Sequence, residues 1–381
     1  MDELTSNSTV TLSKPRLSIW QRLKTPKVRW LILLAVALIT LLVATGVTYA
    51  RYARDRQPDG NQGSSFAINF GSRKPENDQL KLVTANLDGT LVAPDHAKRR
   101  PLAVMVENHP DARPQSGLNH ASVIVEAITE GGITRFMVIF GSRDADKIGP
   151  IRSARPYFVQ YASGWKALYA HAGGSEGGLA AIPAAPIVNL DDTVGYFHRE
   201  PRAGIASEHT LFSSTGDLYR LATDRKSSLD VDFTPWKFED DPSTSDRPSS
   251  QTASIDFSTS DYKVGWSYDS AADTYQRSQA GAPHKDAVSG DQLTAKNVAI
   301  LSVTRQLNAA ANRGKGEWTM NTIGSGTLKL LKHGRLVEGT WKKESLGAMV
   351  RFYDGSGSEL NMGRGRTWLE ITPIDVTVTI Q

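Results

Sequence analysis

The most pronounced apolar stretch of the chain runs from Trp30 to Ala50 and contains no Asp, Glu, Lys, Arg or His. About 20 such residues are enough for a helix to cross the hydrocarbon core of a bilayer. Six basic residues precede the stretch and three follow it closely, so the positive-inside rule places the N-terminus in the cytoplasm and the remainder outside. We therefore expect a single-pass signal anchor in the cell membrane. A cleaved signal peptide is the alternative, with Thr48-Tyr49-Ala50 as the nearest cleavage site.

Polar segments divide the rest of the chain. Residues 1–29 are predicted to form a basic cytoplasmic tail, and residues 51–79, rich in Gly, Ser, Asn and Gln, a flexible linker. Residues 240–252 hold two prolines and no apolar residue, which is typical of an interdomain linker. Two extracytoplasmic domains are therefore expected, at residues 80–239 and 253–381.

The first of these regions combines strand and helix patterns. Leu102–Val106 is a short apolar run typical of a buried strand, and two β-branched runs on either side of Gly131-Gly132 predict a hairpin over 121–140. Residues 154–164 are predicted to be helical, with Pro156 at the first position. Further elements are a strand at 167–170 and a helix at 217–222 capped by Ser213 or Ser214. This mixture predicts an α/β domain with a mixed sheet.

The second region is mostly strand-like. Two runs, 327–332 and 335–338, flank His333-Gly334 and predict a hairpin, and the runs 348–353 and 368–372 continue the pattern. The predicted fold class is therefore α+β: an N-terminal mixed α/β domain, a C-terminal β-rich domain and one N-terminal transmembrane helix.

Charge and cysteine content narrow the function. Six of the 44 basic and two of the 40 acidic residues lie in the first 30, which leaves 38 of each sign for the rest of the chain. Such a balanced part lacks the basic field that nucleic-acid binding requires, so no nucleic-acid partner is expected. The chain has no cysteine, which excludes disulfides, thiolate metal sites, cysteine nucleophiles and lipidation on a cysteine.

Two groups of residues carry candidate chemistry. The glycine loop 171–178 follows a strand, so its N–H groups could bind an anion, although a tight strand-to-helix turn is favoured. Arg113, Arg135, Arg152 and Arg155 could bind a carboxylate or phosphate, because Arg suits such anions. Pairing of these arginines with Glu126 or Glu130 inside the protein is an equal alternative.

Other chemistry has less support from the spacing of residues. The eight histidines show no metal-binding spacing, and no G-x-S-x-G sequence frames a serine nucleophile. No cofactor or metal is therefore expected. Glu126 or Glu130 could act as acid or base in glycoside cleavage, although carboxylates at strand ends are usually solvated.

Five segments occur in an order and spacing that closely resemble the YerB-like lipoproteins, a domain-of-unknown-function family of bacterial envelope proteins. They are RPLAVMVEN (100–108), ARPQSGL (112–118), EGGITRF (130–136), IGPIRSAR (148–155) and HAGGS (171–175). The similarity extends to Glu208-His-Thr-Leu-Phe212 and, in the second region, to residues around 266–268, 275–277, 284–286 and 363–368. The resemblance implies two domains tethered outside the membrane, an α/β-type domain followed by a β-rich one, and supplies no reaction.

The chain departs from the family pattern in two respects. Members are typically anchored through a lipidated cysteine, which this chain lacks, so the helix 30–50 must serve as the anchor. Thr210 stands where the family often has Asn, and Pro156 follows the second Arg of the R-S-A-R motif. The geometry of both loops is therefore not given by the resemblance.

The resulting hypothesis is a membrane-anchored binding or scaffold protein of the cell envelope, more in keeping with a binder than an enzyme. Its expected partners are the membrane and an anionic cell-wall glycan, a peptide or an envelope protein. A cofactor-free hydrolase of envelope polymers, with Glu126 or Glu130 as acid or base, is the alternative. The predicted ligand-binding residues are Asn108, Arg113, Gln115, Ser116, Glu126, Glu130, Arg135, Arg152, Ser153, Arg155, His171 and Ser175.

Overall fold

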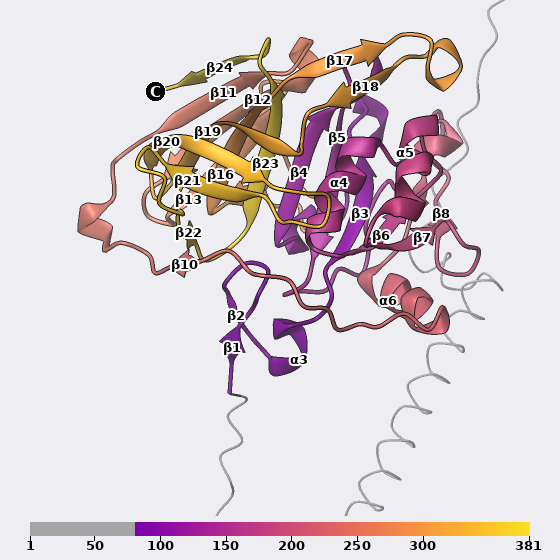
Figure 1. Ribbon diagram of the computed structural model, residues 1–381, viewed down its shortest axis with the longest axis horizontal. Coiled ribbons are helices and arrows are strands. Elements are labelled where there is room, and N and C mark those ends of the chain that lie inside the picture. Colours follow the sequence, from indigo (N-terminus) through magenta and orange to yellow (C-terminus); the bar gives the residue numbers. More distant parts are fainter. Residues whose placement is uncertain (1–80) are drawn as a thin grey trace, which may run out of the picture. The chain divides into compact units, whose positions relative to one another are not determined.

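The structure is a computed structural model that describes residues 81–381 (Figure 1). The predicted tail 1–29, anchor 30–50 and linker 51–79 lie outside the described residues. Among residues 81–381, no helix combines the length and the apolar character needed to cross a membrane. The transmembrane anchor therefore stays a prediction from the sequence.

A ten-stranded mixed sheet forms the centre of the fold. Its strands, in spatial order, are β21 (Arg351–Asp354), β20 (Arg335–Lys343), β19 (Gly324–Lys332), β16 (Asn297–Val303), β23 (Thr367–Pro373), β4 (Val123–Ile128), β5 (Thr134–Phe140), β3 (Leu102–Glu107), β6 (Leu168–His171) and β7 (Val188–Asp191). The predicted hairpins are confirmed, since β4 pairs with β5 and β19 with β20, both antiparallel. The mixed sheet is confirmed as well.

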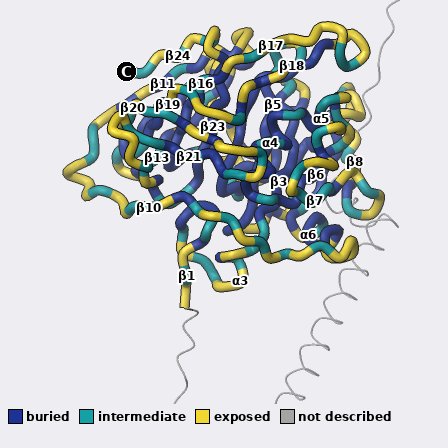
Figure 2. Tube along the Cα trace, viewed as in Figure 1, coloured by how far each residue is buried: buried dark blue, intermediate teal, exposed yellow. Residues whose placement is uncertain are grey.

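The central strands are apolar along their length because both faces of the sheet are covered. Every residue of β3, β4 and β5 is buried. In β3, Leu102, Val104 and Val106 face one hydrophobic cluster, whereas Ala103 and Met105 face the other. Figure 2 shows how the buried residues follow these strands. A strand covered on both faces reads as a continuous apolar run, which is the pattern seen in the sequence.

Helices cover both faces of the sheet around β3. Helix α4 (Pro156–Gly164) begins at the predicted proline and packs Phe158 on the face that carries Met105. Helix α6 (Thr215–Asp224) packs Leu218 on the opposite face. Its N-cap is Ser214, whose hydroxyl accepts a hydrogen bond from the Asp217 N–H at 3.0 Å. The other α-helices between residues 81 and 381 are short: α3 (Pro94–Ala97) and α5 (Glu176–Ala181).

A second sheet packs on the face of the long sheet that also carries α6. Trp266 and Ile255 of this second sheet share a hydrophobic cluster with Val298 and Trp368 of the long sheet. Its strands are β14 (Ala282–Pro283), β13 (Thr274–Gln279), β12 (Lys263–Asp269), β11 (Thr252–Asp256) and β24 (Thr377–Ile380), with β15 (Thr294–Ala295) beside β13. Four short pairs complete the fold: β1 (Val83–Thr84) with β2 (Leu91–Val92), β8 (His198–Arg199) with β9 (Leu211–Phe212), β10 (Phe238–Glu239) with β22 (Met362–Gly363), and β17 (Arg305–Asn308) with β18 (Glu317–Met320).

The two predicted regions share the long sheet. Strand β23 of the second region lies parallel to β4 of the first, with Glu370 opposite Glu126. Within residues 81–381, the α-helices all lie before residue 225, so the second region is β-rich as expected. The segment 240–252 is largely exposed. The domain boundaries stay a prediction, but the regions on their two sides are joined by backbone hydrogen bonds.

Candidate functional site

Several predicted site residues meet at one edge of the sheet, where β3 and β6 end and β5 begins. β3 and β6 are parallel, and β5 runs antiparallel to β3, so Glu107 at the end of β3 lies directly opposite Arg135. The loop before α4 brings Arg152 and Ser153 to the same edge. In open α/β sheets, ligands bind outside the carboxyl ends of the strands. The location therefore fits a binding site.

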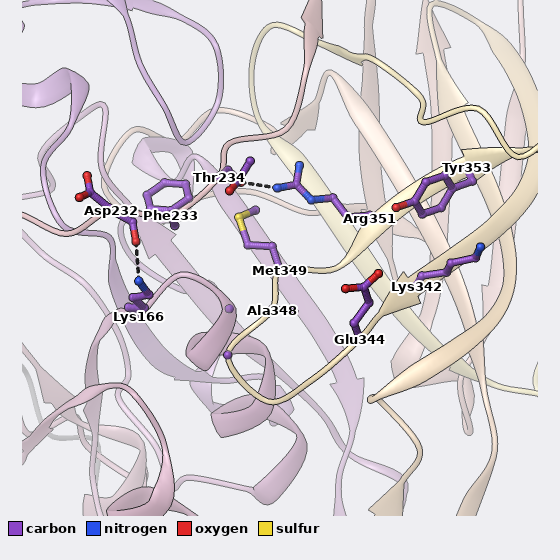
Figure 3. Close-up of a pocket in the computed structure, with 12 residues that line it drawn as sticks. Lys166, Asp232, Phe233, Thr234, Lys342, Glu344, Ala348, Met349, Arg351 and Tyr353 are labelled. Carbon is purple, nitrogen blue, oxygen red and sulfur yellow. Dashed lines mark hydrogen bonds between the residues drawn. The ribbon is translucent and has the colours of Figure 1, made fainter.

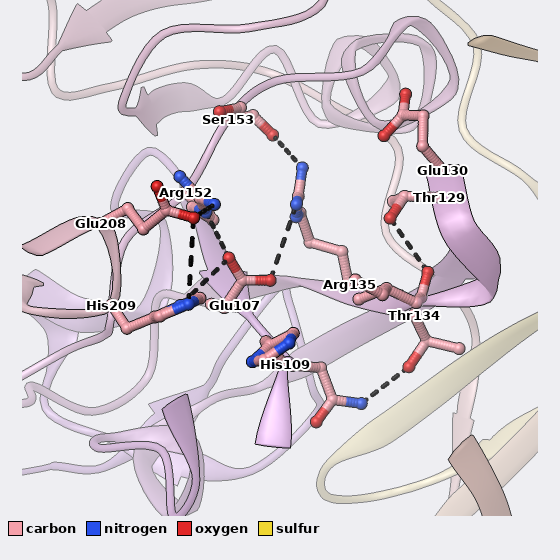
Figure 4. A network of polar contacts seen from close by, with 12 residues as sticks. Glu107, His109, Thr129, Glu130, Thr134, Arg135, Arg152, Ser153, Glu208 and His209 are labelled. Carbon is pink, nitrogen blue, oxygen red and sulfur yellow. Dashed lines mark hydrogen bonds and ion pairs between the residues drawn. The ribbon is translucent and has the colours of Figure 1, made fainter. Parts of the chain in front are cut away.

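Glu107 is the centre of a polar network at this edge (Figure 4). Its side chain is almost fully buried and accepts a hydrogen bond from Arg152 Nε, while Arg135 Nη2 lies 3.6 Å away. Arg135 Nη1 also donates to the Ser153 carbonyl at 3.1 Å. Burial alone would raise the pKa of Glu107, but the two guanidinium groups outweigh it and hold the pKa below its ordinary value. Glu107 is therefore an ionised carboxylate inside the protein.

Arg152 joins this buried carboxylate to the surface. Its Nη2 donates to Glu208 at 2.9 Å, in addition to the contact with Glu107. The Arg152 side chain is 25% exposed and that of Glu208 is 56% exposed. Arg152 therefore has one fixed partner inside and one water-accessible partner outside.

Arg155 is paired inside the protein, as one of the two sequence interpretations proposed. Its Nε and Nη2 donate to the two carboxylate oxygens of Glu130 at 2.7 and 2.6 Å, a bidentate arrangement. Burial raises the pKa of Glu130, but the Arg155 contacts outweigh this and lower it overall. The pair ties the β4–β5 hairpin to the start of α4.

Asn108, Arg113 and Gln115 brace the loop that follows β3. Arg113 donates from Nε to Asn108 Oδ1 at 3.1 Å and from Nη2 to the Asn108 carbonyl at 2.9 Å. Gln115 donates to the same Oδ1 at 2.9 Å, and Asn108 donates to Thr134 at 2.7 Å. Ser116 contributes through its backbone N–H, which donates to Gly149 at 2.8 Å. These contacts shape the loop from within.

The glycine loop binds a carboxylate from the protein itself. Ser175 caps α5, accepts from the Gly178 N–H at 3.1 Å and donates to Glu317 of β18, which also accepts from the Gly177 N–H at 3.2 Å. A Cβ on Gly178 would lie 2.6 Å from the Ala154 carbonyl oxygen, so close packing requires glycine there. His171 contacts the Gly173 carbonyl and Asn189 Oδ1, each at 2.7 Å. The favoured interpretation, a tightly packed turn, accounts for this geometry.

Glu126 lies in the interior, between the two regions of the chain. It is fully buried and accepts from Arg277 of β13, whose side chain is equally buried. Glu370 lies opposite and accepts from Trp266 Nε1 at 3.0 Å. Burial, together with the charge of Glu126, raises the pKa of Glu370 well above its ordinary value. Glu126 therefore belongs to a closed ionic cluster rather than to the exposed edge.

Several residues of these networks were missed in the sequence-based list of site residues. Glu107, Glu208 and His209 stand next to or within motifs of the family resemblance, which was the available signal. Arg277, Glu370 and Glu317 come from the second region, and no local pattern connects them with the first. Their partners are set by the pairing of distant strands.

A cavity of about 510 Å³ lies elsewhere in the described part of the chain (Figure 3). It is bordered by the end of α4, residues 232–234 and the β20–β21 connection. None of the twelve predicted residues lines it; its polar side chains include Lys166, Lys342, Glu344 and Arg351. The predicted arginines and the cavity are therefore separate features.

Both regions of the chain match a family of known proteins. Residues 87–228 match the N-terminal domain, and residues 253–369 the C-terminal domain, of "Protein of unknown function (DUF3048)". The chain is 32% identical over 304 residues to "Putative lipoprotein YerB" of Bacillus subtilis (strain 168), covering 78% of this chain and 88% of that protein. The crystal structure of YerB protein from Bacillus subtilis superposes with a TM-score of 0.68 at 27% identity, covering 78% of this chain and 99% of that one. The chain therefore belongs to the YerB-like, DUF3048 family, as the sequence motifs indicated.

Proposed function

We propose that this chain is a membrane-anchored, extracytoplasmic binding protein of the cell envelope that recognises an anionic wall component or a partner protein. The uncharged run Trp30–Ala50, with its basic flank, supports the anchor. The relative named as a lipoprotein supports attachment to the envelope, and the lack of cysteine favours the apolar run as the anchor. The described domains would then lie outside the membrane.

The exposed partner of Arg152, Glu208, is the observation that carries this proposal. Glu208 is more than half exposed, so its contact with Arg152 contributes little to stability. A carboxylate or phosphate of a ligand can replace it at the same guanidinium edge. The buried carboxylate of Glu107 holds the Arg152 side chain from inside, which lowers the entropic cost of presenting it to a ligand.

The other predicted arginines support this arrangement instead of binding ligand directly. Arg135 is buried against Glu107, Arg155 is paired with Glu130, and Arg113 is hydrogen-bonded to Asn108. Direct contact with the ligand is therefore proposed for Arg152 and the residues around it.

A hydrolase that uses Glu126 or Glu130 has less support. A general acid in glycoside cleavage needs a raised pKa and access to substrate. Glu126 is sealed in the core, and the pKa of Glu130 is lowered by Arg155 despite its burial. The carboxyl group with a strongly raised pKa, Glu370, is also fully buried.

Removing the internal competitor should strengthen binding. We expect the Glu208→Gln protein to bind isolated cell-wall fragments about two- to fivefold more tightly, because the ligand no longer displaces a charged partner. Full-length protein in detergent is titrated with fragments at low salt. Asp375→Asn is the matched control, since Asp375 is also exposed and pairs with a less exposed arginine, Arg305, at 2.6 Å. Equal binding by Glu208→Gln and wild type would contradict the exchange of partners.

The proposed topology has its own test. Protease added to intact spheroplasts is expected to digest the chain after Ala50 and to leave a short tail of about 50 residues or fewer. Immunoblots with an antibody against each end follow the fragments. Protection of the whole chain would contradict the topology, and release of soluble protein without protease would indicate a cleaved signal peptide.

A further inference from the structure

Three side chains next to the polar network have the composition of a metal site. His109, Asp111 and His209 each offer one ligand atom, and these atoms lie within 4.8 Å of one another. They belong to two turns that are about 100 residues apart in the sequence, at Pro110–Ala112 and Ser207–His209. None is among the twelve predicted site residues, because the sequence spacing gave no metal pattern.

The fold holds these two turns together. Arg202 Nη2 donates to the Asp111 carbonyl at 2.8 Å and to the His209 carbonyl at 3.3 Å. The rings of His109 and His209 are stacked, with centroids 4.9 Å apart and planes inclined by 14°. Arg202 therefore holds the two turns beside each other, and one imidazole must turn out of the stack to ligate the same ion as the other, because imidazole ligates through a lone pair in the plane of its ring.

His209 is a buried imidazole with an unpartnered nitrogen. It is 5% exposed, and its Nδ1 has no hydrogen-bond partner within residues 81–381. Nδ1 lies 3.8 Å from Glu107 and Nε2 lies 3.9 Å from Glu208, both too far for a hydrogen bond. A buried imidazole nitrogen without a hydrogen-bond partner is available as a metal ligand.

The other two groups are accessible and adjustable. The side chains of His109 and Asp111 are 34% and 54% exposed, which gives an ion a path from solvent. His109 Nδ1 lies 3.6 Å from Asp111 Oδ2, near the separation of about 3.3 Å expected for two ligands of a tetrahedral zinc ion. Nδ1 otherwise accepts a long 3.2 Å hydrogen bond from the Asp111 N–H, which an ion would replace.

A second group of two carboxylates and one histidine has a neighbouring lysine that argues against metal binding. Asp241, Asp273 and His333 also lie within ligand distance of one another. There, the Lys296 ammonium contacts Asp241 at 2.7 Å and Asp273 at 2.6 Å, so a cation of the protein already occupies the centre. No lysine or arginine forms an ion pair with Asp111 in the described part of the chain.

We propose that His109, Asp111 and His209 bind one divalent transition-metal ion of the zinc class. Two imidazoles and one carboxylate form a borderline ligand set that suits Zn²⁺ and leaves at least one coordination position for water or a ligand. Glu107 and Glu208 lie near His209 and partly offset the charges of Arg152 and Arg135. This site goes beyond the proposed anion binding and does not depend on it.

Metal titration of the full-length protein in detergent tests the proposal. After chelation and removal of the chelator, Zn²⁺ is added in a calorimeter and Co²⁺ in a spectrophotometer. The wild-type protein is expected to bind about one equivalent, with visible Co²⁺ bands of a four- or five-coordinate site. His109→Gln and Asp111→Asn are expected to weaken binding about 10-fold or more.

The controls separate metal ligation from folding. His109 and Asp111 are substituted because they are partly exposed, and the metal-free melting temperatures of both variants should match that of the wild type. His198→Gln removes a histidine that is 52% exposed and should leave the affinity for the metal unchanged. Absence of binding, or equal binding by His109→Gln, Asp111→Asn and wild type, would overturn the proposal.

Discussion

Replacing Arg277 with Met is expected to lower the free energy of unfolding by about 3–5 kcal/mol, the usual loss when one partner of a buried ion pair is removed. Arg277 and Glu126 are both fully buried. The guanidinium also lies over the Trp368 ring, at 4.5 Å from its centroid, and donates to His284. Its removal leaves Glu126 without a cation inside the core. Urea unfolding of the full-length protein in detergent, followed by tryptophan fluorescence, measures the change.

The double variant Glu126→Gln with Arg277→Met distinguishes charge from packing. It removes both charges, so much of the lost stability should return, giving a coupling of the kind that double-mutant cycles detect between contacting residues. Arg305→Met, at an exposed pair with Asp375, should change stability by about 1 kcal/mol or less. A loss of similar size in the Arg277 and Arg305 variants would mean that the Glu126–Arg277 contact does not hold the two regions together.

Arg155→Gln is expected to cost about 3 kcal/mol, because it removes both hydrogen bonds to the half-buried carboxylate of Glu130. The pair joins the β4–β5 hairpin to α4, so its loss should loosen two neighbouring elements. Urea midpoints at pH 7 measure the effect. Arg152→Gln is the comparison within the same loop and should cost less, about 1 kcal/mol, since Arg135 still neutralises Glu107.

The pH dependence of the stability lost in Arg155→Gln shows whether the ion pair with Glu130 is its cause. Because the folded pKa of Glu130 is lowered, its contribution is present above the ordinary glutamate pKa and is lost as the pH falls through the folded value. The stability gap between wild type and Arg155→Gln should therefore be widest near neutral pH and should shrink as the pH falls below the ordinary glutamate pKa. A gap of constant size from neutral to acid pH would assign the loss to packing instead.

Local patterns were sufficient to predict many of the elements. The continuous apolar run of β3, the hairpin around Gly131-Gly132 and the helix beginning at Pro156 each depend on neighbouring residues, and the structure confirms all three. The family resemblance was carried by short motifs and is confirmed by the matches over both regions.

Pairings between residues that are far apart in the sequence could not be predicted from local patterns. The sheet continues from β4 into β23 although more than 230 residues separate them, so the partner of Glu126 comes from the second region. The same reason explains why the carboxylate at the glycine loop is Glu317 and why Arg152 meets Glu208. Residue type indicated that the arginines needed anionic partners, but only the fold shows which ones they have.

The four predicted arginines differ in their burial and in their partners. Arg135 and Arg155 are buried with fixed partners, and Arg113 is held by the loop after β3. Arg152 combines a buried carboxylate with an exposed one. Binding to an anionic partner is therefore proposed to depend on Arg152 far more than on the other three.

Binding of the Arg152→Gln protein to isolated cell-wall fragments tests this claim most directly. Full-length wild type, Arg152→Gln and the matched control Arg305→Gln are compared at low and high salt, with melting temperatures measured in parallel. The proposal predicts about 10-fold weaker binding by Arg152→Gln, equivalent to about 1.4 kcal/mol, with a small change in melting temperature and with wild-type binding that declines as salt rises. Unchanged binding by folded Arg152→Gln protein, together with a large fall in its melting temperature, would contradict the account and make Arg152 a structural residue.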